Sequence, residues 1–311
     1  MCPLKRVKST RGLGDRLSSQ QSSFLGTSTF FGNDVDPQMV RLATMNLTLR
    51  GLPNVRILLR NVLTTTLDAE QRDEAGLPRN GYDVVLANPP FSGTVDPDRI
   101  VDDVKVGNTG KTEILFLKYL IESLKPGGRC GVVVPEGLLF GSTGPHKELR
   151  RQLIENNRVE AVMSLPGGVF NPYAGVKTSV LLFRKGGSTE RVLFLHADND
   201  GYKLDSNHDA PIEADDLPLC RETYLTRDAR WTAWSKRDPQ AEWTAKWWFA
   251  EAGEIRSKEF NMSAGRYRPA IASTAVHRDP RELLDELAEL EREIADEVLA
   301  LREALAEQPR A

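Results

Sequence analysis

The four residues Asn88, Pro89, Pro90 and Phe91 combine side chains and backbone groups that can hold and present an amino group. They directly follow the apolar run YDVVLA, which is typical of a β-strand. Open α/β sheets bind their ligands at the carboxyl ends of their strands, and a motif in this position lies there. We therefore interpret the four residues as part of a catalytic site and not as a plain strand-ending turn.

The chemistry that these residue types suit is attack by an exocyclic amine, whose lone pair is delocalised into a ring or a carbonyl group. The Asn88 side-chain oxygen and the Pro89 backbone carbonyl can accept both N–H protons, which localises the lone pair and aims it. Pro89 and Pro90 fix φ and remove competing donors, and Phe91 offers an apolar face on which a flipped base can stack. No strong general base is required before attack, since the proton can leave after the amine becomes cationic.

The elements that would position this motif alternate between strands and helices. From Phe30 to about residue 197, runs rich in Val, Ile and Leu are separated by amphipathic helical segments. This alternation indicates a parallel sheet covered on both faces, of the Rossmann-like α/β class. At one boundary we expect Asp36 to be the N-cap of a helix, with Pro37 at its first position and Gly51 just past its end.

The motif and its flanking text resemble the class I, S-adenosylmethionine-dependent adenine-N6 DNA methyltransferases, and in particular the modification (M) subunits of type I restriction-modification systems. The matching stretches are FFGNDVDPQMVRLATMNLTLRG, YDVVLANPPF, KTEILFLKYLIESLKPGGRCGVVVPEGLLFG, LPGGVFNPYAGVKTSVLLFRKG, NDGYKLD and FNMSAGRYRP. The resemblance covers residues 30–305 and implies methyl transfer to N6 of an adenine flipped out of duplex DNA. Asn88 and Pro89 would hold the amine, and Phe91 would stack on the base. The implied partners are DNA, a specificity subunit that reads the target sequence, and a restriction subunit.

The resemblance further implies cofactor contacts at Asp34, Asn61 and Asn88. Asp34 falls where the family's second strand ends in an acidic residue that binds the ribose hydroxyls of S-adenosylmethionine. Capping of the next helix, shared with Asp36, is the alternative role of Asp34. After the third strand the family usually has Gly-Asp-Ser/Thr-Leu, whose Asp grips the cofactor's adenine amino group, whereas this chain has RNVL at 60–63. Asn61 can accept the same hydrogen bond, but without charge.

The family's first strand and glycine-rich loop, of the DPACGTGGF kind, have no counterpart before Phe30. The sequence GLGD at 12–15 is too short and follows no strand. That loop lets the backbone approach the methionine end of the cofactor, and its strand is the central one in the family's sheet. We therefore expect an N-terminally truncated methyltransferase, in which the strands ending at Asp34 and Ala87 lack their shared neighbour and have exposed edges.

The composition excludes several classes of protein and favours one cellular compartment. The chain has 311 residues and a net charge of -3, which argues against a uniformly basic nucleic-acid coat. No run approaches the length of a membrane span or the apolar centre of a signal peptide. The cysteines Cys2, Cys130 and Cys220 form no CxxC, which favours a reducing compartment over disulfides or a zinc site. We expect a cytoplasmic protein without membrane contact and without a metal ion.

The chain divides into five segments that differ in composition and in hydrophobic pattern. Residues 1–28 are basic and rich in Ser and Gln, so we expect them to be disordered, and 29–197 form the partial methyltransferase α/β core. Residues 198–218 are an acidic excursion whose spacing does not match a calcium-binding loop. Residues 219–279 contain all five tryptophans and indicate a small packed element. Residues 280–311 predict an amphipathic helix that docks on a partner subunit or on its own domain. Its apolar stripe consists of Leu283, Leu287, Leu290, Ile294, Val298, Leu301 and Leu305.

Two alternative functions stay open at this point. Amide-nitrogen methylation of a protein glutamine uses a similar NPP motif, but Tyr is the commoner fourth residue there, and such enzymes have no long C-terminal helix. A non-catalytic remnant could still dock a specificity subunit through residues 280–311. The missing glycine-rich loop favours the remnant, whereas the intact NPPF sequence favours an enzyme.

Overall fold

The computed structural model describes residues 18–20, 31–52, 56–74, 77, 80–171, 175–236 and 246–269, with single positions between 284 and 298. The chain divides into two compact units, Met1–Arg268 and Pro269–Ala311, and each is described by itself. In the second unit the described positions from 284 onward are helical: Leu284, Ala288, Glu291, Arg292, Ile294, Ala295 and Val298. The rest of the helix predicted over 280–311, and most of segment 1–28, lie outside the described residues.

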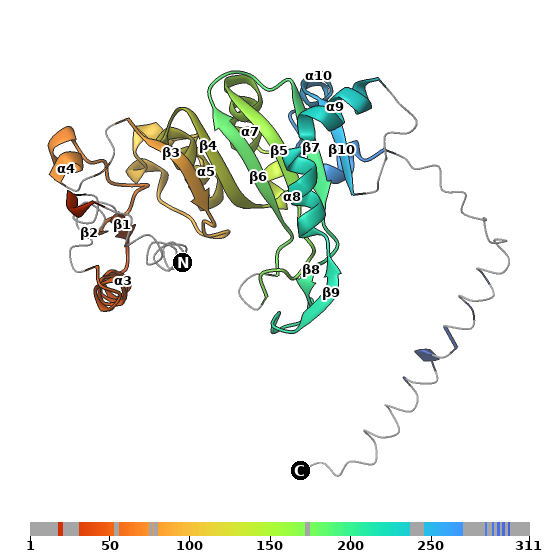
Figure 1. Ribbon diagram of the computed structural model, residues 1–311, viewed down its shortest axis with the longest axis horizontal. Helices are drawn as coiled ribbons and strands as arrows, with labels where there is room; N and C mark the ends of the chain where they lie inside the picture. Colours follow the sequence, from red (N-terminus) through yellow and green to blue (C-terminus); the bar gives the residue numbers. More distant parts are fainter. Residues whose placement is uncertain are drawn as a thin grey trace, which may run out of the picture. The chain divides into compact units, whose positions relative to one another are not determined.

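In the first unit, strands and helices alternate up to the strand that ends at Ser164, and that strand is the first of five successive strands that extend to Asp215 with no helix between them among the described residues (Figure 1). Its strands are β1 (Phe31–Asp34), β2 (Arg56–Leu59), β3 (Tyr82–Ala87), β4 (Leu124–Pro135), β5 (Asn157–Ser164), β6 (Thr178–Lys185), β7 (Arg191–His196), β8 (Asp200–Tyr202), β9 (Pro211–Asp215) and β10 (Trp247–Glu251). Its α-helices are α3 (Pro37–Leu49), α4 (Ala69–Glu74), α5 (Thr112–Ser123), α6 (Glu136–Phe140), α7 (Gly144–Asn156), α8 (Leu217–Leu225), α9 (Arg227–Ser235) and α10 (Ala252–Ser257). Short 3-10 helices are η2 (Pro97–Arg99), η3 (Asp102–Val104) and η4 (Ala264–Tyr267).

Six strands form the main sheet, in the order β10-β7-β5-β6-β4-β3. Strands β3, β4, β5 and β7 run parallel to one another, and β6 and β10 run antiparallel to their neighbours. The α/β class is confirmed, while the parallel sheet that the strand pattern indicates is corrected to a mixed one. The connection from β5 to β6 contains no helix among its described residues, and β6 returns beside β5 as an antiparallel strand.

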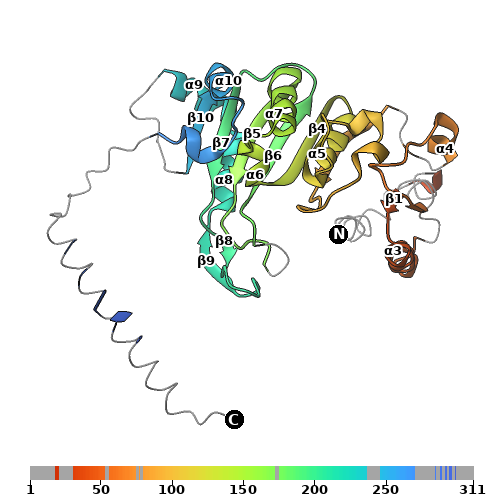
Figure 2. The ribbon, with the colours of Figure 1, turned by 180° about the vertical axis from the view of Figure 1, so that it is seen from behind.

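Side chains of the main sheet alternate between two apolar clusters. Along β7, Phe194 belongs to the cluster that includes α5, α6 and α7, whereas Leu193 belongs to the cluster that α8 and α9 cover. Figures 1 and 2 show these helices on opposite sides of the sheet. On β10, Trp248 is buried in the first cluster and Trp247 in the second. This strand of the Trp-rich segment is therefore an integral edge of the main sheet.

Strands β1 and β2 form a separate, parallel two-stranded sheet on which α3 packs. The helix begins as predicted, because the Asp36 carboxylate accepts the N–H of Gln38 and Pro37 is the first helical residue. It ends at Leu49, and Gly51 follows with a φ of 84°. The local signals at both ends of this helix are therefore confirmed.

Strand β3 is an edge strand of the main sheet. Among the described residues, no strand pairs with β1 or β3 on the side away from β2 or β4, respectively. The side chain of Leu86 on β3 is 71% exposed, so no described element covers it. The prediction that no strand precedes β1 falls on residues 1–30, of which only 18–20 are described.

Strands β8 and β9 form an antiparallel hairpin in the acidic segment 198–218. The hairpin follows β7 and extends beyond the main sheet (Figure 1). All five residues of β9 are exposed. The acidic excursion predicted from the sequence is thus an ordered hairpin that projects from the end of a central strand.

Candidate active site

Asn88, Pro89, Pro90 and Phe91 follow β3 at the carboxyl edge of the parallel strands of the main sheet. The register of β3 with β4 ends at the pair Ala87 and Val132, so the motif begins where the ladder ends. Asn88 is exposed and Pro89 and Phe91 are half-buried. The structure therefore presents the motif at the edge where α/β sheets bind their ligands.

Residues 93–95, which follow the motif, are hydrogen-bonded to residues 110–112 at the beginning of α5. The Gly93 carbonyl accepts the N–H of Thr112 at 3.1 Å and its hydroxyl at 3.2 Å. The N–H of Val95 donates to the Gly110 carbonyl at 2.8 Å, and a Cβ at Gly110 would overlap the Val95 backbone. The NPPF sequence is thus held by β3 on one side and by residues 110–112 on the other.

Phe170 lies against Phe91 from a different part of the chain. The two ring centroids are 5.7 Å apart and the rings meet edge to face at 71°. Phe170 belongs to the connection between β5 and β6 and is not among the site residues predicted from the sequence. Its place in the matched stretch LPGGVFNPYAG is the one signal that could have found it. The structure thus adds a second aromatic ring to the site.

Glu136 brings a charge to the same edge of the sheet. It directly follows β4, and its carboxylate accepts a hydrogen bond from the Ser164 hydroxyl at 3.2 Å and lies 3.4 Å from the Lys177 ammonium. Ser164 ends β5 and Lys177 precedes β6, so the ends of three strands meet at this carboxylate. The edge that carries NPPF is therefore polar, as a ligand-binding edge requires.

Asp34 and Asn61 lie at the carboxyl ends of β1 and β2, and both side chains organise local turns. Asp34 Oδ1 accepts the N–H of Asp36 at 2.9 Å, and Asn61 Oδ1 accepts the N–H of Leu63 at 3.0 Å. Among the described residues, no donor is bonded to the other Asp34 carboxylate oxygen. That oxygen is of the right kind for ribose hydroxyls, and the Asn61 amide remains a donor for a ring nitrogen.

A backbone contact joins the cofactor-side segment to the loop after NPPF. The N–H of Val101 donates to the Leu63 carbonyl at 3.0 Å. Around it, Leu63, Ile100, Val104 and Leu115 form a buried cluster. The structure therefore brings the Asn61 segment to the loop that follows the motif. In the described part of the chain, no hydrogen bond joins Asp34 or Asn61 to Asn88 itself.

A cavity of about 430 Å³ lies between the β1–β2 sheet and the beginning of β3. Asn33, Arg60, Tyr82 and Tyr119 are among the residues that line it. Burial lowers the pKa of the Arg60 guanidinium and raises the pKa of the Tyr82 phenol. The buried Asn33 Oδ1 has no hydrogen-bond partner among the described residues. This cavity adjoins the first residue of β3, whereas the NPPF sequence follows the last.

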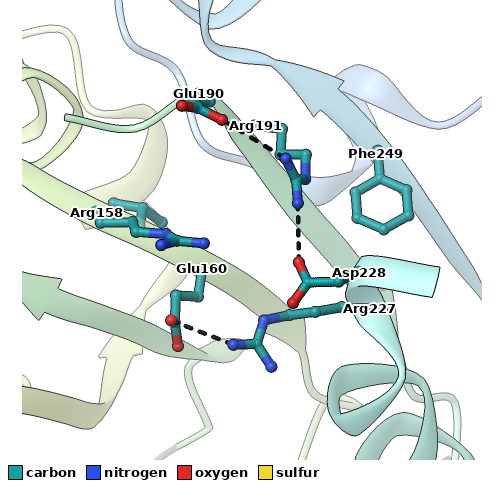
Figure 3. A pocket seen from close by; sticks show the side chains of 8 residues that line it. Arg158, Glu160, Glu190, Arg191, Arg227, Asp228 and Phe249 are labelled. Carbon is teal, nitrogen blue, oxygen red and sulfur yellow. Dashed lines mark hydrogen bonds and ion pairs between the residues drawn. The ribbon is translucent and has the colours of Figure 1, made fainter. Parts of the chain in front are cut away.

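The pocket in Figure 3 lies near the amino ends of β5 and β7 and is filled by ion pairs. Glu160 accepts a hydrogen bond from the Tyr224 hydroxyl at 2.5 Å and pairs with Arg227 at 3.3 Å, while Arg191 pairs with Asp228 at 2.8 Å. Burial alone would raise the pKa of Glu160, but the hydrogen bonds and the arginine charges lower it. About 20 Å³ remains free, which is room for one water molecule. We interpret this network as structural.

Neither a metal cluster nor a membrane span is found in the described part of the chain. No group of three or more His, Cys, Asp or Glu side chains there is placed to hold a metal ion. No helix there combines the length and the apolar character needed to cross a bilayer.

The sequence model of the N-6 DNA Methylase family matches residues 15–275. The chain belongs to that family. One relative is the methylase subunit of the type I restriction enzyme EcoEI from Escherichia coli, which is 31% identical over 265 residues. The match covers 85% of this chain and 50% of that subunit, so the chain spans about half the length of the relative. The family membership inferred from the NPPF sequence and its flanks is confirmed.

Solved structures of family members share the fold. A chain from a structure titled for the complex assembly and conformational transition of the type I R-M system superimposes with a TM-score of 0.62 at 27% identity, over 98% of this chain and 60% of that chain. The EcoKI M protein superimposes with a TM-score of 0.57 at 23% identity, over 82% of this chain and 56% of that chain. The mixed α/β fold of this chain is therefore shared with these two solved structures.

Proposed function

We propose that this chain is the methyltransferase region of a type I modification subunit that methylates adenine at N6 in DNA. The observation that carries the proposal is the NPPF sequence at the carboxyl end of β3 in a member of the N-6 DNA Methylase family. The family match favours DNA over a protein glutamine as the methyl acceptor. DNA, a specificity subunit and a restriction subunit are the partners of such a chain, and the cytoplasm is where it acts.

Each residue of the motif has a separate role in presenting the amine. The Asn88 side-chain oxygen and the Pro89 carbonyl accept the two N–H protons of the flipped adenine, so that the lone pair points at the methyl donor. Pro90 keeps the Pro89 carbonyl in place. Phe91 stacks on the base, and Phe170, which lies against Phe91, covers the same site.

S-adenosylmethionine, when bound, supplies a methyl group on a positively charged sulfur. Asp34 would hold its ribose hydroxyls with the carboxylate oxygen that the local turn leaves available. Asn61 would hold its adenine, and Asn88 lies on the acceptor side of the same site. The placement of Asp34 and Asn61 at the ends of adjacent parallel strands supports this assignment.

The substitution Asn88→Ala tests the catalytic assignment. It removes one of the two acceptors, and we expect methyl transfer to fall at least about 100-fold, as when one oriented hydrogen-bonding group of an active site is lost. The measurement is incorporation of labelled methyl groups into target DNA by the chain assembled with its specificity subunit. Asn156→Ala at the exposed end of α7 is the matched control. Retained methylation in the assembled Asn88→Ala variant would overturn the proposal.

We further propose that residues 280–311 dock on the specificity subunit. The described positions of this segment are helical, and the apolar residues of the whole segment recur at helical spacing. Deletion of residues 280–311 is expected to impair co-purification with the specificity subunit. Undiminished complex formation would instead assign the helix to its own domain.

A further inference from the structure

The acidic hairpin β8–β9 contacts the loop that carries Phe170, and we propose that it positions this ring over the acceptor-base site. The inference rests on the proposed function for the identity of that base. It gives Asn171 and Asp205 the role of positioning residues, which act through Phe170 and do not touch the substrate. Four sets of contacts connect the ring of Phe170 to the core of the sheet.

The first set of contacts forms the tight loop that holds Phe170. At its beginning, the N–H of Leu165 donates to the Thr178 carbonyl at 3.0 Å, which ties the loop to β6. At its tip, the N–H of Asn171 donates to the Gly168 carbonyl at 2.9 Å, and Gly168 has a φ of 85°. Phe170 lies inside this closed turn, so its position follows that of Asn171.

The second set of contacts joins this loop to the hairpin. The Asn171 side-chain amide donates to the Asp205 carbonyl at 3.3 Å. A Cβ added to Gly168 would lie 3.1 Å from the Asn171 amide nitrogen and 3.8 Å from the Leu204 carbonyl oxygen. The glycine backbone therefore lies close to the hairpin, and the Asn171 amide bridges the two segments.

The third set of contacts orders the hairpin turn. The Asp205 carboxylate accepts the N–H groups of Asn207 and His208, each at 3.0 Å. These backbone bonds hold the pKa of Asp205 below its ordinary value. The N–H of Lys203 donates to the Ala210 carbonyl at 2.8 Å, which closes the turn from the other side. The Asp205 carbonyl is thus presented from an ordered turn.

The fourth set of contacts attaches the hairpin to the end of β7. The Asp216 carboxylate accepts the N–H groups of Asp198 at 2.9 Å and Asn199 at 3.1 Å. The Lys246 ammonium, next to β10, donates to Asp198 at 2.7 Å and to Asp216 at 2.8 Å. Several acidic side chains of the segment are therefore used to build and anchor the hairpin.

These contacts limit how far the space between Phe170 and Phe91 can widen. A flat base held between two parallel rings needs roughly 7 Å from ring to ring, because each contact distance is about 3.5 Å. The observed 5.7 Å between the ring centroids is shorter, so Phe170 has to turn or shift when a base enters. The contact from Asp205 to Asn171 limits how far the loop moves, and so keeps Phe170 close enough to hold the base.

Hydrogen exchange at the amides of residues 165–171 tests the support in the full chain without DNA. In Asn171→Ala and Asp205→Ala we expect exchange to become at least about threefold faster, with an unchanged melting temperature. Asp205→Asn should restore the slow exchange, because an Asn side chain accepts the same backbone N–H bonds. Asp209→Ala removes an acid from the same turn and is the matched control. Unchanged exchange in both alanine variants would overturn the proposal.

Turnover of the assembled methyltransferase tests the effect on the base. For Asn171→Ala we expect kcat to fall about tenfold with a less than twofold change in KM for DNA, because the base is misplaced while duplex binding persists. The emission of 2-aminopurine at the target position should change in parallel, and Asp205→Asn should again behave as the unaltered chain. Faster exchange with unaltered kcat and emission would overturn the role at the base site.

Failure of this proposal and failure of the proposed function can be told apart. If Asn88→Ala retained methylation, the proposed function would be overturned, while the exchange experiment would still decide whether the hairpin supports the loop.

Discussion

The interior of the main sheet and the region of β1, α3 and β3 differ in how completely their apolar side chains are covered. Phe183 on β6 is 1% exposed and Cys130 on β4 is 4% exposed. By contrast, Leu49 on α3 is 84% exposed and Leu86 on β3 is 71% exposed. Two strands and one helix bury too little apolar surface to complete a core, whereas six strands with helices on both faces complete one.

The two halves of the proposed reaction are attached to the closed core in different ways. The acceptor motif extends from β3, whose inner edge is bonded to the main sheet, and Phe170 reaches it from the connection between two central strands. The candidate cofactor residues Asp34 and Asn61 stand on the two-stranded sheet, which is joined to the rest through the Leu63 cluster. We infer that the acceptor half is the better pre-organised of the two. Four experiments address the comparison.

Thiol reactivity should show the largest contrast between the two regions. Burial raises the pKa of the Cys130 thiol to about 12. At pH 8 we expect alkylation of Cys130 in the folded chain to be at least about three orders of magnitude slower than alkylation of a cysteine introduced by Leu86→Cys. The measurement is mass-spectrometric labelling over time, with denatured protein as the control. Similar rates in the folded chain would contradict the contrast.

Removal of apolar side chains should destabilise one region and not the other. Phe183→Ala is expected to lower the free energy of unfolding by about 3–5 kcal/mol, because it leaves a cavity in the closed core. Leu49→Ala should change it by less than about 0.5 kcal/mol, because the side chain is already exposed. Urea denaturation measures both values. A large loss in Leu49→Ala would mean that the exposed stripe is covered in solution.

The Glu160 network should contribute an intermediate, pH-dependent stability. Burial opposes ionisation, but the Tyr224 hydroxyl and the Arg184 and Arg227 guanidinium groups outweigh it and hold the pKa of Glu160 below its ordinary value. A lowered folded-state pKa stabilises the fold above the unfolded-state pKa, and the contribution is lost as the pH falls through the folded-state pKa. Glu160→Gln should therefore lower the free energy of unfolding by about 1–3 kcal/mol at pH 7. Below about pH 4.5, the stability of this variant should fall less steeply with pH than that of the unaltered chain. An unaltered acid limb of the stability curve would count against this role.

The ion pair at the edge of β3 should show the smallest effect. Lys125 and Asp83 pair at the beginning of this strand, and the side chain of Asp83 is 76% exposed. Asp83→Asn should change the free energy of unfolding by less than about 0.5 kcal/mol, and less again at high salt, because solvent screens exposed charges. Urea denaturation at two salt concentrations is the measurement. A loss above about 1 kcal/mol would show that this edge contributes more than its exposure indicates.

Local signals predicted much of the fold. The Asp36 N-cap, Pro37 and Gly51 correctly bounded α3, because capping depends on residues within one turn. The apolar run before Asn88 correctly predicted β3, because a short run of Val and Leu is itself a local strand signal. The direction of β6 was not predictable from its composition, because Val and Leu suit parallel and antiparallel strands alike. The role proposed for Phe170 was missed because its partner Phe91 is far away in the sequence.

The sequence by itself determined the family, the acceptor motif and the order of strands and helices, because these depend on residue type and on short spacings. Tertiary structure decided which strand ends meet, that Phe170 lies over Phe91, and that the acidic segment reaches back to the loop that carries this ring. Those contacts join residues far apart in the chain, and their geometry depends on how the whole sheet packs. The exposure of Leu86 on β3 belongs to the tertiary level, because it depends on which of the described elements pack against this strand.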